Sequence, residues 1–183
     1  LVVSPTLPVH NVAELVAYAQ ARPGELNYST PGARTIYHLE GERFKLRTGI
    51  DIVHIPYRGL VPALAELISG NVEMSFASLP AALPLIRAGR VRALAVASAV
   101  RSPLLPDVPT LRESGVDDVD ATVWYGILAP AGTPPDVVGI LAGAIRDAAR
   151  SPEYLQALMD MGASPLVTTP DEFGRKLRDE VAR

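Results

Sequence analysis

The fold of the chain is decided by its middle, residues 50–97, which read IDIVHIPYRGLVPALAELISGNVEMSFASLPAALPLIRAGRVRALAVA. In this stretch, short apolar runs of strand length alternate with helical patterns that end at glycine. The predicted strands cover residues 50–55, 72–76 and 91–97, and the predicted helices cover residues 62–69 and 80–88. Strands that alternate with helices are typical of βαβ units. We therefore expect an α/β protein with a mostly parallel sheet and flanking helices.

Helix signals continue toward the N-terminus. Asn11 as a cap, with Glu14 three residues later, predicts a helix that stops at residues 22–24. Residues 28–32 are rich in turn formers, and a further helix is expected from about residue 35 to residue 47. The apolar face predicted for that helix consists of Ile36, Leu39 and Leu46.

The C-terminal third predicts one strand and three helices. The strand is expected over residues 119–128, where the alternating apolar residues are Val119, Val123, Tyr125 and Ile127. Capping signals for the three helices stand at Thr133, Ser151 and Thr169. The first of these helices is expected to bury Val137, Leu141, Ile145 and Ala148.

Composition excludes several classes of protein. The 183 residues carry a formal net charge of -3, and the length is typical of one domain or a large part of two. No basic stretch suits contacts with phosphates, so nucleic acid is not expected as a partner, and the apolar runs are too short to span a membrane. The absence of cysteine excludes disulfides and thiolate metal sites. Residues 1–5, LVVSP, lack an initiator Met and a signal-peptide pattern, so we expect a chain cut from something longer.

The polar turn before the helix at 35–47 is the strongest candidate site. A turn that runs into a helix presents backbone N–H groups at the positive end of the helix dipole, which favours a carboxylate or phosphate. Hydroxyl groups add donors, and an arginine can hold a carboxylate with two hydrogen bonds. The alternative is an ordinary capped helix with a solvated arginine. The candidate ligand-binding residues of the turn are Ser29, Thr30, Gly32, Ala33, Arg34 and Thr35.

The histidines do not indicate a metal site, because no two of His10, His38 and His54 have the sequence spacing of metal ligands. His38 lies about one turn into the predicted helix and is expected to face the same pocket, whereas His54 is expected to be a core or edge residue. A hydrolase built on His38 and a serine, Ser29 or Ser78, is a weaker hypothesis because the chain has no nucleophile-elbow motif.

Two further candidates follow predicted strands. Tyr57 comes after the strand at 50–55, and Ser78 comes after the strand at 72–76. The carboxyl ends of parallel strands meet at one edge of a sheet, where open α/β sheets bind ligands. We therefore expect Tyr57 and Ser78 to converge with the turn at Thr30.

An ordered set of motifs along the whole chain resembles one family, the Bug/TctC solute-binding receptors of bacterial tripartite tricarboxylate transporters. The motifs are PGELNY at 23–28, HL at 38–39, VHIPYRG at 53–59, IRAGRVRALAV at 86–96, RSP at 101–103, LPDVPT at 105–110, WYG at 124–126 and PAGTP at 130–134. The resemblance implies a non-enzymatic periplasmic protein, without a cofactor, that captures a small organic acid such as a di- or tricarboxylate for membrane permease subunits. An alternative is a sensing module that signals ligand to a partner protein.

The same resemblance implies a fold like that of type II periplasmic binding proteins, with one complete lobe and the C-terminal part of the other. Residues 1–122 would be the second lobe, with the first few residues as hinge, and residues 123–183 the return segment of the first lobe. The N-terminal part of the family pattern is missing, and an incomplete lobe could pair with a second copy to give a dimer. In the ligand loop Thr30, Gly32 and Thr35 match the family pattern, whereas Arg34 replaces a glycine and Ser78 replaces a common aspartate.

Overall fold

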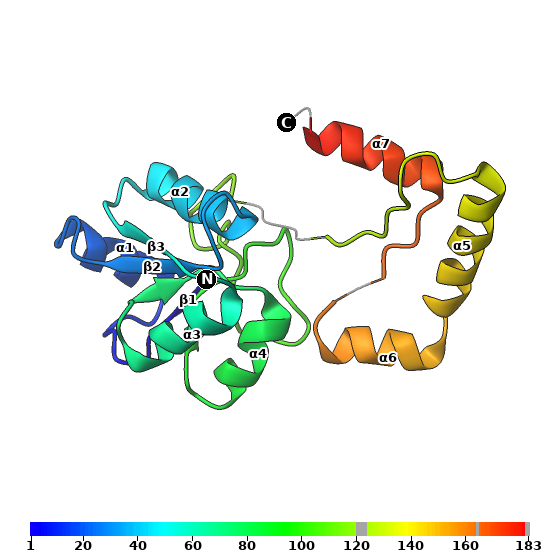
Figure 1. Ribbon diagram of the computed structural model, residues 1–183. Helices are drawn as coiled ribbons and strands as arrows, with labels where there is room; N and C mark the ends of the chain where they lie inside the picture. Colours follow the sequence, from blue (N-terminus) through cyan, green and yellow to red (C-terminus); the bar gives the residue numbers. More distant parts are fainter. Residues whose placement is uncertain (120–123, 164, 182–183) are drawn as a thin grey trace. The chain divides into compact units, whose positions relative to one another are not determined.

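The computed structural model describes residues 1–119, 124–163 and 165–181 (Figure 1). The chain forms two compact units, Leu1–Trp124 and Tyr125–Arg183. The boundary expected between residues 122 and 123 falls outside the described residues. No described helix is both long and apolar enough to cross a membrane.

The first unit is built on a mixed five-stranded sheet. Its strands, in spatial order, are β3 (Val53–Pro56), β2 (Asn27–Thr30), β4 (Met74–Ser75), β1 (Val2–Val3) and β5 (Arg92–Ala93). Strand β2 pairs in parallel with both β3 and β4, as the alternation of strands and helices predicts. Strand β1 pairs antiparallel with β4 and β5. The expected parallel arrangement therefore holds around β2, and the N-terminal strand makes the sheet mixed.

Two apolar layers cover the two faces of this sheet. Helices α1 (Val12–Gln20) and α2 (Ile36–Thr48) contribute Leu15 and Phe44 to one buried cluster, which also holds Val3. Helices α3 (Leu60–Ser69) and α4 (Leu79–Arg87) contribute Leu67 and Ala82 to the other, which also holds Val2. Neighbouring residues of a strand point to opposite faces, so Val2 and Val3 contribute one side chain to each layer.

Strand β2 was missed by the sequence analysis, which predicted a turn over residues 28–32. Its residues are polar, yet Ser29 and Thr30 have no exposed surface. The Ser29 hydroxyl donates to the Ala63 carbonyl oxygen at 3.2 Å, and the Ser75 hydroxyl donates to the Ser29 carbonyl oxygen at 2.9 Å. Buried hydroxyl groups are tolerated where such partners exist, so a strand forms in a sequence that looks like a turn.

Helix α2 buries a different face from the one predicted. Its buried residues are Glu40, Gly41 and Phe44, whereas the predicted inner residue Leu46 is 83% exposed. The reason is the aromatic ring of Tyr28, which lies against Gly41 and is itself fully buried. A helix can approach a strand this closely only where it presents a residue without a side chain.

The second unit contains helices α5 (Pro135–Ala148), α6 (Pro152–Asp160) and α7 (Pro170–Val181). Expected caps are confirmed at Ser151 and Thr169, whose side chains accept from the backbone N–H groups of Tyr154 and Glu172. For α5 the cap is Pro134 rather than the predicted Thr133, whose hydroxyl donates to the Pro130 carbonyl oxygen.

The predicted burial on α5 is wrong, because neither α5 nor α6 contains a buried residue. Val137, Leu141 and Ile145 are 39%, 49% and 41% exposed, and Ala148 is exposed as well. The strand expected over residues 119–128 is also not formed at residues 119 and 124–128, and Val123 lies outside the described residues. A strand needs a neighbour for its hydrogen bonds, and the described residues of this unit form no other strand.

The contact between Tyr28 and Gly41 gives a stability prediction. A Cβ atom at residue 41 would lie 2.6 Å from Tyr28 Cζ and 2.9 Å from its hydroxyl oxygen, so Gly41→Ala overpacks this layer. We expect it to lower the free energy of unfolding by about 1–3 kcal/mol in urea titrations followed by circular dichroism. Gly139→Ala is the control, because a Cβ on this helical glycine meets nothing within 4 Å. Equal effects of the two substitutions would contradict this account.

Candidate functional site

The turn between β2 and α2, residues 31–35, is held by hydrogen bonds of its own. The Thr35 hydroxyl donates to the Gly32 carbonyl oxygen at 2.8 Å and accepts from the His38 backbone N–H at 3.4 Å, so Thr35 is the cap of α2. The Arg34 backbone N–H donates to Nδ1 of His38 at 3.2 Å. Nδ1 of His38 is thus the acceptor that holds the backbone of Arg34 in place.

Arg34 adopts the left-handed backbone conformation, with φ of 64°. The sequence comparison with the family pattern placed a glycine at this position, and the backbone here keeps a glycine-like shape. A non-glycine residue in this conformation costs roughly 1–2 kcal/mol. The turn therefore carries local backbone strain at Arg34.

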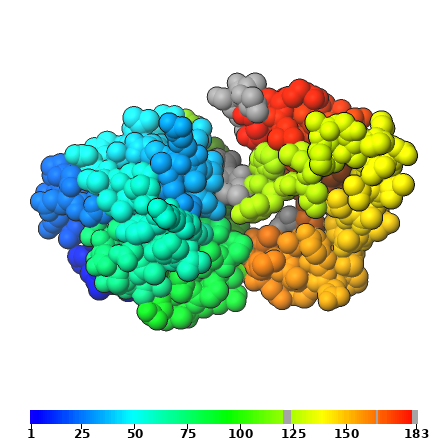
Figure 2. Space-filling view, in the orientation of Figure 1, coloured from blue at the N-terminus to red at the C-terminus, as the bar shows by residue number. Residues whose placement is uncertain are grey.

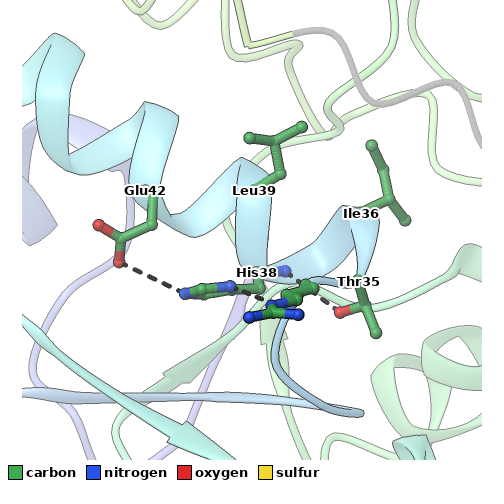
Figure 3. Close-up of a pocket in the computed structure, with 6 residues that line it drawn as sticks. Thr35, Ile36, His38, Leu39 and Glu42 are labelled. Atoms are coloured by element: carbon green, nitrogen blue, oxygen red, sulfur yellow. Dashed lines mark hydrogen bonds and ion pairs between the residues drawn. The ribbon is translucent and has the colours of Figure 1, made fainter. Parts of the chain in front are cut away.

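The start of α2 forms one wall of an open hollow of about 340 Å³ (Figure 3). Ile36 and Leu39, predicted to lie in the core, instead face the hollow and are 36% and 47% exposed. Figure 3 shows their side chains extending to the same side of the helix. The start of α2 lies on the surface of the first unit (Figure 2). The lining residues are Arg34, Thr35, Ile36, His38, Leu39 and Glu42.

His54 joins the site although the sequence analysis assigned it only to the core or an edge. It lies on the edge strand β3, in register with Tyr28 of β2. Its ring stacks on His38 with 4.0 Å between the ring centres, and its Nε2 lies 2.7 Å from the Thr30 hydroxyl oxygen. The parallel register of β2 and β3 is the signal that could have placed His54 here, but β2 was not predicted from the sequence.

The titration of His54 follows from this environment. Burial lowers its pKa first, the charge of a protonated His38 lowers it further, and the carboxylate of Glu42 acts in the opposite direction. The net result is a pKa below the ordinary histidine value, so His54 is held neutral beside the turn.

Glu42 closes the far end of the hollow as a carboxylate. Burial acts to raise its pKa, but hydrogen bonds from the Tyr28 hydroxyl at 2.7 Å and from Lys45 Nζ at 3.2 Å outweigh burial and lower it. Its Oε1 also lies 4.0 Å from Nε2 of His38. The same arrangement raises the pKa of Tyr28, through burial and then the bond to Glu42.

The other predicted site residues fall in three places. Ser29 lies under the sheet surface with its hydroxyl bonded to Ala63, and it does not line the hollow. Thr30 is buried beneath the turn, where its hydroxyl bonds to His54 and to the Gly32 carbonyl oxygen. Ala33 is exposed on the turn, and Gly32 has a φ of 151°.

Tyr57 and Ser78 follow β3 and β4, which both run parallel to β2, so they leave the same edge of the sheet as the turn. The expected convergence of Ser78 with the turn stays a prediction. The Tyr57 backbone N–H donates to the Thr30 carbonyl oxygen at 2.9 Å, so its loop touches the turn directly. The Tyr57 side chain packs on the cluster of α3 and α4, and Ser78 begins α4. Neither residue lines the hollow.

The described residues contain no group of three or more His, Asp or Glu side chains that could hold a metal ion. The hydrolase hypothesis named Ser29 or Ser78 beside His38, and two of these groups are engaged in other hydrogen bonds. Nδ1 of His38 accepts from Arg34, and the Ser29 hydroxyl donates to the Ala63 carbonyl oxygen in the core. A helix start beside an arginine is chemically suited to an anion.

The strain at Arg34 is testable. Arg34→Gly relieves the left-handed conformation but makes the unfolded chain more flexible, so the two effects partly cancel. We expect a net gain of about 0.5–1 kcal/mol in the free energy of unfolding, measured in urea. A loss of stability would show that the arginine side chain is itself a structural element.

The lowered pKa of His54 gives a pH prediction. The unfolded chain binds a proton at His54 more tightly than the folded chain does, so this contribution to stability is complete above the unfolded pKa of about 6.5. It is lost as the pH falls below that value toward the lower folded pKa. Urea titrations between about pH 5 and pH 8 measure the free energy of unfolding. We expect it to fall less steeply with decreasing pH in His54→Gln than in the unmodified chain. The exposed His10 supplies the control, because His10→Gln should leave the decline unchanged.

Comparison with known proteins identifies the family of the chain. The sequence model of the tripartite tricarboxylate transporter family receptor, TctC, matches residues 1–183. The protein BugT of Bordetella pertussis is 38% identical over 183 residues, which is 100% of this chain and 56% of BugT. The chain therefore spans little more than half the length of this relative.

Solved structures match as well. Rpa4515 of R. palustris with adipate superposes with a TM-score of 0.95 at 37% identity, covering 100% of this chain and 61% of Rpa4515. MatC from Rhodopseudomonas palustris with bound malate gives a TM-score of 0.86 at 28% identity, covering 100% of this chain and 63% of MatC. The periplasmic binding protein BugD gives a TM-score of 0.93 at 28% identity, covering 99% of this chain and 61% of BugD. The chain belongs to the TctC family of tripartite tricarboxylate transporter receptors, which are periplasmic solute-binding proteins.

Proposed function

We propose that this chain is part of a receptor that captures a small organic acid outside the cytoplasm and delivers it to the permease subunits of a tripartite tricarboxylate transporter. Residues 1–122 would form the second lobe of the receptor and residues 123–183 the return segment of the first. The receptor binds and releases its ligand without chemical conversion. Two structural relatives support a carboxylate ligand, since they were solved with adipate and with malate.

The observation that carries the proposal is the strained turn at the start of α2. Arg34 is in the left-handed conformation, Thr35 caps the helix, and both line the hollow. The first N–H groups of a helix and an arginine side chain attract the same kind of group, a carboxylate. Strain of this kind persists where surrounding structure holds it, and it concentrates at ligand sites. Closure of the first lobe over the turn would exclude water and strengthen these contacts.

Binding can be tested with the 183-residue chain, using malate and adipate as probes. We expect both acids to shift the amide NMR signals of residues 32–38, with a dissociation constant in the millimolar range because one lobe supplies only part of the contacts, roughly 4 kcal/mol. Thr35→Val removes a hydroxyl at the site and should weaken these shifts.

The matched control is Thr169→Val. Thr169 caps α7 as Thr35 caps α2, with its hydroxyl accepting from the Glu172 backbone N–H at 3.3 Å, and it lies outside the hollow. Both substitutions remove a cap of similar worth, about 1 kcal/mol. If neither acid moves the signals of residues 32–38, the site assignment is wrong. If both substitutions weaken binding equally, the effect of Thr35 is one of helix stability alone.

A further inference from the structure

We propose that His38 is a pH-sensitive switch in the turn before α2: the neutral ring holds the backbone of Arg34, and protonation of the ring releases it. Such a switch goes beyond the proposed function, because it is a property of the turn itself and acts with or without a bound acid. Its parts are the two stacked imidazole rings of His38 and His54 and the hydrogen bonds that each ring makes to the turn.

The neutral form of His38 holds the turn through one nitrogen. Its Nδ1 accepts from the Arg34 backbone N–H at 3.2 Å, and a neutral imidazole that accepts at Nδ1 carries its proton on Nε2. Arg34 has a φ of 64°, a conformation that a residue with a side chain keeps only where its surroundings hold it. The bond to His38 is therefore part of what keeps Arg34 left-handed.

A protonated His38 cannot make this bond. Both nitrogens of a charged imidazole carry a proton, so Nδ1 would meet the Arg34 N–H as donor against donor. One of the two groups must then move, and the backbone of Arg34 loses its acceptor. The charged ring would instead pair with Glu42, whose Oε1 lies 4.0 Å from Nε2 of His38 (Figure 3).

His54 differs from His38, because a proton on its ring leaves its bond to the turn in place. The Thr30 hydroxyl donates its one proton to the Gly32 carbonyl oxygen at 3.1 Å, so Nε2 of His54, 2.7 Å from that hydroxyl, is the donor in their bond. A donor nitrogen remains a donor when the ring becomes charged. Both histidines thus hold the turn, but it is the bond to His38 that depends on the protonation state.

The stack of the two rings opposes a second charge. The ring centres of His38 and His54 lie 4.0 Å apart, so two positive rings would repel each other. Burial, and then the charge on His38, lower the pKa of His54. A first proton on the stack is therefore expected on His38, where it breaks the bond to Arg34.

The other charged or titratable groups around the stack are Tyr28 of β2, Arg34 of the turn, and Glu42 and Lys45 of α2. The pKa of Tyr28 is raised by burial and by its bond to Glu42. The pKa of Glu42, which burial acts to raise, is lowered on balance by its hydrogen bonds. Neither group changes its charge between about pH 5 and pH 8, so a response of the turn in this range reports the histidines.

NMR spectroscopy of the 183-residue chain between about pH 5 and pH 8 tests the switch. We expect the ¹⁵N signal of His38 Nδ1 and the amide signal of Arg34 to shift with one common midpoint. Below it, the protection of the Arg34 amide against hydrogen exchange, measured relative to an unstructured peptide, should fall roughly fivefold. The Tyr154 amide, which donates to the Ser151 hydroxyl at the start of α6, is the internal reference and should not titrate. An Arg34 amide that stays unchanged, or that changes with a different midpoint from His38, would overturn the proposal.

Two substitutions of His38 separate the acceptor from the proton. In His38→Asn the side-chain oxygen can replace Nδ1 as acceptor and does not take up a proton in this range, so the Arg34 amide should stay protected at every pH tested. In His38→Ala the acceptor is gone, so the amide should be exposed to exchange at every pH tested. A pH-dependent Arg34 amide in either variant would overturn the proposal.

His54→Gln assigns the response to the correct histidine. Its side-chain amide keeps a donor for Thr30 but cannot become charged, so the Arg34 amide should still titrate with His38. Conversely, the pKa of His54 should rise in His38→Asn, because the charge on His38 no longer opposes its protonation. A response of Arg34 that disappears in His54→Gln would show that His54 is the sensor and would overturn the role of His38.

Discussion

The packing of the Tyr28 ring on Gly41 fixes the distance between strand β2 and helix α2, and the rest of the candidate site depends on it. The ring occupies the space that a side chain at residue 41 would need, so α2 lies directly on the strand. The Tyr28 hydroxyl then reaches Glu42 at 2.7 Å, which orients that carboxylate toward His38. One aromatic residue thereby positions the turn, the imidazole stack and the charged end of the hollow.

Much of the fold could be predicted because it depends on local patterns. The helices α1, α3 and α4 begin and end within a few residues of the predicted positions, since caps, glycines and apolar spacing are all encoded nearby. Strand β2 could not be predicted in the same way. Its serine and threonine hydroxyl groups have partners on elements distant in sequence, such as Ala63 and His54, and only the folded sheet reveals them.

The hollow lies at the turn that the sequence analysis selected as its candidate site, but its lining is only partly the predicted one. The turn, Arg34, Thr35 and His38 were identified because a polar turn before a helix is a local signal. The apolar wall was missed, since Ile36 and Leu39 carry the spacing of a core face and core burial is the ordinary outcome of such spacing. Helix α2 buries its other face because Gly41 and Phe44, which lie on that face, pack more closely on the sheet.

Arg34 connects the stability of the turn with its function. An exposed turn position in the left-handed conformation has an obvious low-energy occupant in glycine, and nearly all the other left-handed residues described in this chain are glycines. Asp118, the other exception, forms a close ion pair with Arg47, whereas Arg34 has no such partner among the described residues. The conformation of Arg34 is held within the chain by the bond from its backbone N–H to Nδ1 of His38, which leaves the guanidinium itself outside any recorded ion pair. Under the proposed function a carboxylate would pair with the guanidinium and with the helix start at once.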